Sequence, residues 1–148
     1  MIPQISWISR EGDYPQICRE IREDLLEETP FVLWLTGDLG AGKTTFSGVL
    51  LHEFGLSHAV PVLSPTFTYL TEYDTPIGRI AHMDLYRLVA GDSDSVETLL
   101  SGRTYRGLIV EWPEKACDAE AIAPTRILRI TSDDDTTHRL LSYGRRKS

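Results

Sequence analysis

Hydrophobic and polar positions follow two different periods along this chain. Nearly continuous apolar runs are typical of buried parallel strands, and they occur at residues 31–36 and 107–111. Apolar residues spaced three or four apart predict helices over about 15–28, 44–54 and 95–101. Segments rich in β-branched and aromatic residues predict further strands at 4–9, 67–73, 79–84, 126–132 and 138–143.

Short turns join two pairs of these strands. Residues 74–78 read Asp-Thr-Pro-Ile-Gly and predict an antiparallel hairpin of the strands on either side. Asp133–Asp135 predicts the same for the last two strands. The pattern therefore predicts a mixed sheet with a parallel centre and antiparallel hairpin additions, covered by helices. No linker divides the chain, so we expect one domain over residues 1–148, and the strand order stays open.

The segment between the first apolar run and the following helix gives the strongest chemical signal. Gly37–Thr44 reads Gly-Asp-Leu-Gly-Ala-Gly-Lys-Thr and matches G-x-x-x-x-G-K-[ST], the P-loop. Its glycines let backbone N–H groups point at phosphate oxygens, and the next helix presents its positive N-terminal end. Lys43 then reaches the β- and γ-phosphates, and the Thr44 hydroxyl binds Mg²⁺. We expect nucleotide contacts from Asp38, Leu39, Gly40, Ala41, Gly42, Lys43, Thr44 and Thr45. The fold class predicted is α/β, a P-loop NTPase-like three-layer sandwich.

Two acidic residues that close apolar strands are candidates for the rest of the site. Asp84 ends the run 79–84, and Glu111 ends the run 107–111. In open α/β sheets the ligand lies beyond the carboxyl ends of the strands, where Mg²⁺ needs a carboxylate. The Asp84 strand belongs to a predicted hairpin, so the end that faces the nucleotide stays open. Asp84, Glu111, a hydroxyl such as Thr66, or backbone could orient the attacking water.

Missing residue types indicate which nucleotide is bound. The chain contains no asparagine, so the Asn-Lys-x-Asp signature of GTPases is absent and ATP is favoured. Its glutamines, Gln4 and Gln16, both precede the P-loop. A Ras-like glutamine that orients water is therefore not expected.

Other polar residues have both a functional and a structural interpretation. Ser64-Pro65-Thr66 fits either an ordinary turn or a switch that senses Mg²⁺ and the γ-phosphate. His82 lies two positions before Asp84 on the same strand face, and we expect it to pack or hydrogen-bond rather than act as a base. Four arginines are surface charges or contacts of phosphate or an acidic partner: Arg79, Arg87, Arg103 and Arg106.

Composition limits the location and the partners of the chain. The net charge of −7 opposes non-specific binding of nucleic acid, so we expect another protein to make most of any RNA contact. No apolar run approaches the roughly 20 residues of a membrane span, and the N-terminus shows no signal peptide. Cys18 and Cys117 are isolated and indicate reduced thiols. These features predict a cytoplasmic protein without a membrane partner.

Four sequence blocks, taken together, resemble the TsaE family, the small bacterial ATPases of tRNA threonylcarbamoyladenosine synthesis. The blocks are Gly37–Thr45, Ser64–Thr68, His82–Leu88 and Val110–Pro113, which reads Val-Glu-Trp-Pro. The resemblance implies ATP binding and slow, Mg²⁺-dependent hydrolysis, stimulated in a complex with TsaB-like and TsaD-like proteins. The TsaD-like partner would transfer the threonylcarbamoyl group to adenosine 37 of tRNA, so this chain would meet tRNA only through the complex.

The same resemblance implies roles for individual residues. Thr44 and Glu111 would bind Mg²⁺, and Asp84 would assist hydrolysis together with Lys43. Trp112 would lie close to the nucleotide, and Ser64 and Thr66 would belong to a switch-like loop.

The chain departs from the family pattern after Leu88, where residues 89–100 lack the usual Leu-Gly pair. The resemblance therefore leaves the partner contacts of this segment open.

Two alternative functions from other classes remain. One is a small P-loop kinase that phosphorylates a metabolite, and the other is a nucleotide-binding regulatory module without turnover.

Overall fold

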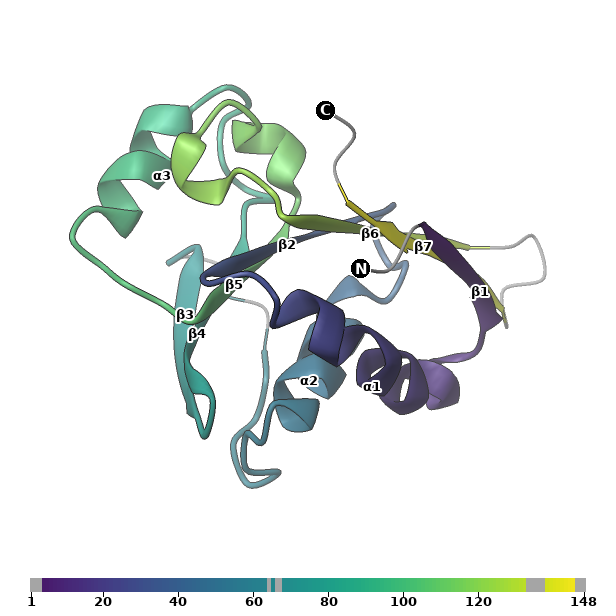
Figure 1. The fold of residues 1–148 in the computed structure, drawn as a ribbon. Helices are drawn as coiled ribbons and strands as arrows, with labels where there is room; N and C mark the ends of the chain where they lie inside the picture. The colour runs from purple at the N-terminus through teal and green to yellow at the C-terminus, as the bar shows by residue number, and fades with distance from the viewer. Residues whose placement is uncertain (1–3, 64, 66–67, 133–137, 146–148) are drawn as a thin grey trace.

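The computed structural model describes residues 4–63, 65, 68–132 and 138–145 (Figure 1). Within them, seven strands form one sheet in the order β1-β7-β6-β2-β5-β4-β3. The strands are β1 (Ile5–Ser9), β2 (Phe31–Thr36), β3 (Leu70–Thr75), β4 (Gly78–Asp84), β5 (Gly107–Glu111), β6 (Arg126–Ser132) and β7 (Arg139–Gly144). The helices are α1 (Tyr14–Leu25), α2 (Lys43–Glu53) and α3 (Ser93–Leu100), with 3₁₀ turns η1 (Glu11–Asp13), η2 (Pro113–Ala116) and η3 (Glu120–Ile122).

The sheet is parallel at its centre and antiparallel at its margins. β2 pairs in parallel with β5 and β6, and β5 pairs in parallel with β4. β3 pairs antiparallel with β4, β7 with β6, and β1 with β7. The predicted mixed sheet with hairpin additions is confirmed. Because β4, β5 and β2 run in the same direction, their carboxyl ends meet at one edge of the sheet.

Helices cover both faces of the central strands (Figure 1). α1 and α2 lie on one face, and α3 lies with η2 and η3 on the other. Alternate residues of β2 fill the two cores, with Leu33 and Leu35 toward α1 and α2, and Val32 and Trp34 toward α3. A strand covered on both faces must be apolar at nearly every position, which explains the run at 31–36. The predicted three-layer α/β arrangement is confirmed.

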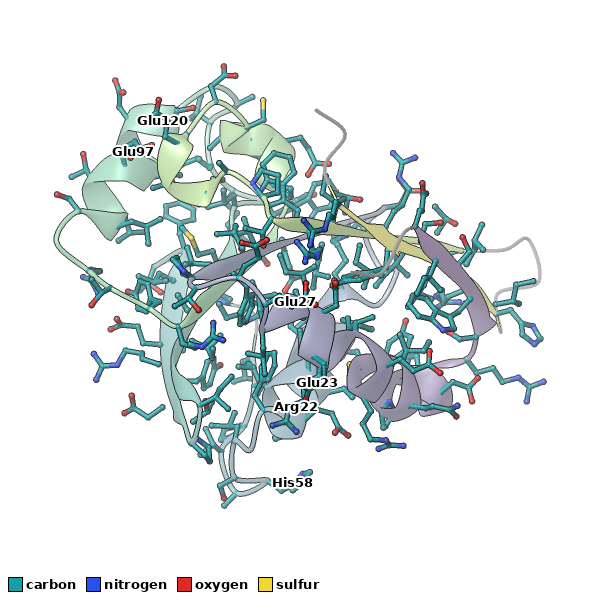
Figure 2. All side chains as sticks on the ribbon, in the orientation of Figure 1. Arg22, Glu23, Glu27, His58, Glu97 and Glu120 are labelled. Atoms are coloured by element: carbon teal, nitrogen blue, oxygen red, sulfur yellow. The ribbon has the colours of Figure 1, made fainter. Side chains whose placement is uncertain are left out.

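The outer surfaces of the helical layers are polar. Figure 2 shows Arg22 and Glu23 of α1 in one layer, and Glu97 of α3 and Glu120 of η3 in the other. In the part of the chain that is described, no helix combines the length and the apolar character that crossing a membrane requires.

Two predicted helix boundaries are wrong. α1 ends at Leu25 rather than at Glu28, because the N–H groups of Glu27 and Glu28 bond to carbonyls three residues earlier in a tightening turn. α3 begins at Ser93 rather than 95, because the Asp92 carboxylate accepts a hydrogen bond from the Ser95 N–H at 3.2 Å and caps the helix. The predicted strand 67–73 is displaced, because β3 begins at Leu70, after a turn at residues 68–69, and runs to Thr75. Residue 67 and the predicted turn at Asp133–Asp135 lie outside the described residues.

A buried ionic cluster fastens α1 to the antiparallel side of the sheet. Arg126 of β6 and Asp24 of α1 are 1% and 3% exposed, and Arg126 Nε donates to Asp24 Oδ2 at 2.5 Å. A second guanidinium nitrogen, Nη2, lies 3.3 Å from Asp24 Oδ1. The Tyr143 hydroxyl of β7 donates to the same carboxylate. One carboxylate therefore links three elements that are far apart in the sequence.

Candidate functional site

The loop Gly37–Thr44 connects β2 to α2 at the carboxyl edge of the parallel strands. Two of its glycines are required by geometry. Gly37 has a φ of +148°, and a Cβ there would lie 2.2 Å from the Ile130 carbonyl oxygen. Gly42 has a φ of +104° directly before α2, and a Cβ there would lie 2.8 Å from the Tyr14 hydroxyl. A side chain at Gly37 would therefore push the loop away from β6, and one at Gly42 would be strained by its left-handed φ and would collide with Tyr14 of α1.

Lys43 is folded back over its own loop. Its Nζ donates to the carbonyl oxygens of Gly37 at 2.6 Å and Asp38 at 2.9 Å. The ammonium also lies 4.4 Å from the centre of the Trp112 ring, within cation–π range. Burial lowers the pKa of Lys43, and the negative charge of Glu111 opposes that shift. The Lys43 ammonium is thus held beside the loop by two carbonyl oxygens and by the face of the Trp112 ring.

Glu111 lies directly beside the start of α2. Thr44 Oγ1 donates to Glu111 at 3.0 Å from Oε1 and 3.3 Å from Oε2. Ser47 Oγ lies 3.5 Å from Glu111 Oε2, and His82 Nε2 lies 2.5 Å from the same oxygen. The Glu111 side chain is only 2% exposed. The two residues proposed for Mg²⁺, Thr44 and Glu111, are therefore in contact.

Asp84 is the register partner of Glu111 in the parallel pair of β4 and β5. This pairing settles the orientation that the sequence left open, because both carboxylates lie at the carboxyl ends of neighbouring strands. Asp84 Oδ1 accepts a hydrogen bond from the Tyr86 N–H at 3.0 Å, which fixes the turn after β4. The Leu85 N–H donates to the Glu111 carbonyl at 3.0 Å and ties the two strand ends together.

These residues surround a cavity of about 410 Å³. It is lined by Glu11, Leu39, Gly40, Gly42, Lys43, Thr44, Thr45, Asp84, Tyr86, Arg87, Glu111 and Trp112. Most of the predicted site residues thus share one cavity. Asp38 and Ala41 do not line it, although the Asp38 carbonyl holds Lys43 and the Ala41 carbonyl accepts from Arg139 Nε at 3.2 Å. Ser64 and Thr66 lie outside the described residues.

Trp112 forms one wall of this cavity in an uncommon backbone conformation. Its φ of +58° is left-handed, which is unusual for a bulky residue, and it turns the chain from β5 into η2. The Tyr86 ring packs against it with centroids 5.0 Å apart. Trp112 therefore lies beside Lys43 and lines the cavity, and its expected closeness to a nucleotide stays a prediction.

The four arginines considered in the sequence separate in space. Arg87 lines the cavity, whereas Arg79 pairs with Asp74 at 3.0 Å and Arg103 with Glu72 at 3.4 Å. Arg106 instead donates to the Glu28 and Leu26 carbonyls. The sequence prediction missed Glu11, Tyr86 and Arg139. Tyr86 follows Asp84 so closely that its position could have been anticipated, but Glu11 and Arg139 come from the two ends of the chain and carry no local signal.

Comparisons with known proteins identify a family for this chain. The family profile described as "Threonylcarbamoyl adenosine biosynthesis protein TsaE" matches residues 9–141. The tRNA threonylcarbamoyladenosine biosynthesis protein TsaE of Aquifex aeolicus is 40% identical over 113 residues, which are 75% of this chain and 79% of that protein. The protein of the same name from Haemophilus influenzae is 39% identical over 100 residues, which are 65% of this chain and 60% of that protein.

A solved structure extends the likeness to nearly the whole chain. The crystal structure of YdiB from Bacillus subtilis superposes with a TM-score of 0.69 at 26% identity, over 97% of this chain and 86% of that one. This chain therefore agrees in sequence with TsaE proteins and in fold with YdiB. The chain belongs to the TsaE family of tRNA threonylcarbamoyladenosine biosynthesis proteins.

Proposed function

We propose that this chain binds ATP with Mg²⁺ and hydrolyses it as an accessory subunit of the complex that forms threonylcarbamoyladenosine at position 37 of tRNA. The observation that supports this most directly is the contact of Thr44 with Glu111, at the foot of the cavity that Lys43 and Asp84 also line. The family membership supports a role in threonylcarbamoyladenosine synthesis, and the residues around the cavity support the proposed binding of ATP and Mg²⁺. Nothing in the cavity or in the relatives' names favours the alternative of a metabolite kinase.

The phosphates of ATP would lie over the loop Gly37–Thr44. Backbone N–H groups at the start of α2 and the helix dipole favour an anion there. Lys43 now donates to two loop carbonyls, and phosphate oxygens would replace these neutral acceptors with charged ones. We therefore expect the Lys43 side chain to turn from these carbonyls toward the phosphates when ATP binds.

Thr44 and Glu111 fit a magnesium ion. Both offer hard oxygen atoms, and Mg²⁺ usually combines one or two such protein ligands with phosphate oxygens and water. When bound, the ion would neutralise charge on the β- and γ-phosphates. Glu111 would hold that ion, and Thr44 would link it to the loop.

Asp84 is proposed to orient the water that attacks the γ-phosphate. It lies on the strand next to Glu111, in register with it, and lines the same cavity. We expect Asp84→Asn to bind ATP normally and to lose hydrolysis by about 100-fold or more, because positioned proton acceptors contribute on that order. Binding is measured by calorimetry and turnover by phosphate release. An Asp84→Asn protein with full turnover would show that another group orients the water.

The partners are proposed to be a TsaB-like and a TsaD-like protein in the cytoplasm. The net charge of −7 suits a subunit that leaves tRNA contact to others. Cys18 and Cys117 are free, and free thiols are typical of proteins in a reducing compartment.

The test mixes the purified chain with its cognate TsaB and TsaD homologues and follows ATP hydrolysis. We expect hydrolysis to rise above that of the separate proteins, and Glu111→Gln to abolish the rise. The absence of both association and stimulation would refute the accessory role. Transfer of phosphate to a small acceptor rather than to water would support the kinase instead.

A further inference from the structure

His82 lies under the proposed magnesium site and is completely buried. It is on β4, two residues before Asp84, and its side chain is 0% exposed. Side chains alternate along a strand, so His82 shares a face with Ile80, which packs toward α1 and α2. Thr44, Ser47 and Glu111 meet on that same side of the sheet.

Among the described residues, the hydrogen-bonding contact of the imidazole is with Glu111. His82 Nε2 lies 2.5 Å from Glu111 Oε2. A carboxylate that binds Mg²⁺ is ionised and only accepts hydrogen bonds, so the proposed role of Glu111 assigns the proton of this contact to Nε2 as donor. His82 and Thr44 are therefore two donors that hold one buried carboxylate. A charge-assisted bond in such a dry site fixes the carboxylate more firmly than a neutral bond would.

The other imidazole nitrogen shows that packing alone does not explain this residue. His82 Nδ1 is buried and has no hydrogen-bond partner in the part of the chain that is described. An unpaired buried polar atom costs free energy that a leucine of similar size would not cost. The site thus keeps a histidine, despite that cost, for the donor at Nε2.

We infer that His82 is a positioning residue that orients Glu111 for Mg²⁺. This rests on the proposed ATPase function, because it assigns a second residue to the same metal site. Outer groups that orient a metal ligand typically contribute 10–100-fold to metal affinity. His82 would make this contribution without touching the ion or the nucleotide.

The test measures how much Mg²⁺ is needed for tight binding of a fluorescent ATP analogue, with binding in EDTA as the metal-free reference. We expect His82→Leu to raise the half-saturating Mg²⁺ concentration by about 10–100-fold, with metal-free binding unchanged. His82→Gln should restore much of the wild-type value, because its amide nitrogen reaches about as far as Nε2. Met83→Leu, the buried neighbour on the opposite face, is the matched control and should leave the Mg²⁺ requirement unchanged.

Several outcomes would overturn the inference. An unchanged Mg²⁺ requirement in a folded His82→Leu protein would do so, and so would an equal loss of metal-free and metal-dependent binding. If His82→Leu does not fold, His82→Gln is compared with His82→Asn, whose shorter amide stops near the Nδ1 position. Equal Mg²⁺ requirements of those two variants would then contradict the inference. A wild-type protein that binds no nucleotide would refute the proposed function itself, a result distinct from all of these.

Discussion

Replacing Lys43 with alanine is expected to weaken ATP binding by about 10- to 150-fold, because a hydrogen bond to a charged group contributes roughly 1.5–3 kcal/mol. The Lys43 ammonium lines the cavity and is held by the Gly37 and Asp38 carbonyls of the loop. Without it, the phosphates would keep the backbone N–H groups and lose their charged donor. Calorimetric titration with ATP and Mg²⁺ measures the change.

Lys115→Ala is the matched control for this variant, because Lys115 belongs to η2 and does not line the cavity. Its affinity for ATP should equal that of the wild type. Lys43→Ala should also remain folded, because the hydrogen bonds described for its ammonium go to two carbonyls of its own loop and its contact with the Trp112 ring is a single cation–π contact. A Lys43→Ala protein that binds ATP as tightly as the wild type would place the nucleotide elsewhere.

The second large effect is expected at Asp24, in the buried cluster with Arg126 and Tyr143. Asp24→Ala would leave the Arg126 guanidinium, 1% exposed, without its main counter-charge. Breaking a buried pair in this way costs about 3–5 kcal/mol, because an uncompensated charge remains inside the protein. Urea denaturation measures the loss in the free energy of unfolding.

Glu28→Ala provides the comparison for Asp24→Ala. Glu28 lies 3.5 Å from Arg126 Nη1, but its side chain is 38% exposed, so its removal should cost about 1 kcal/mol or less. The two variants thus separate a buried partner from a solvated partner of the same arginine. A loss of less than about 1 kcal/mol in Asp24→Ala would mean that the cluster does not stabilise the fold as described.

The sequence predicted the parts of the site that depend on local pattern. The loop Gly37–Thr44 is specified by residue types at fixed spacing, and its strand and helix follow from adjacent periodicity. Asp84 and Glu111 were found because each closes an apolar run. The direction of the Asp84 strand could not be found, because it depends on pairing between β4 and β5 across the sheet rather than on the residues of either strand.

Contacts between distant segments were beyond the reach of sequence pattern. Asp24 and Arg126 are 102 positions apart, and neither shows a signal that would pair them. His82 was expected to pack or to hydrogen-bond, and the structure identifies its partner as Glu111, 29 positions away. The 3₁₀ turns η2 and η3 were also missed, because three or four residues are too few to show a helical period.

The most direct measurement for the whole account is a crystal structure with a non-hydrolysable ATP analogue and Mg²⁺. We expect phosphates over the loop Gly37–Thr44, Lys43 turned from its carbonyls onto them, and an ion held by Thr44 and Glu111. A second cavity of about 520 Å³, lined in part by Trp34, Arg129 and Arg145, offers a clear alternative location. A nucleotide bound there, with Lys43 still on its own loop, would contradict the account.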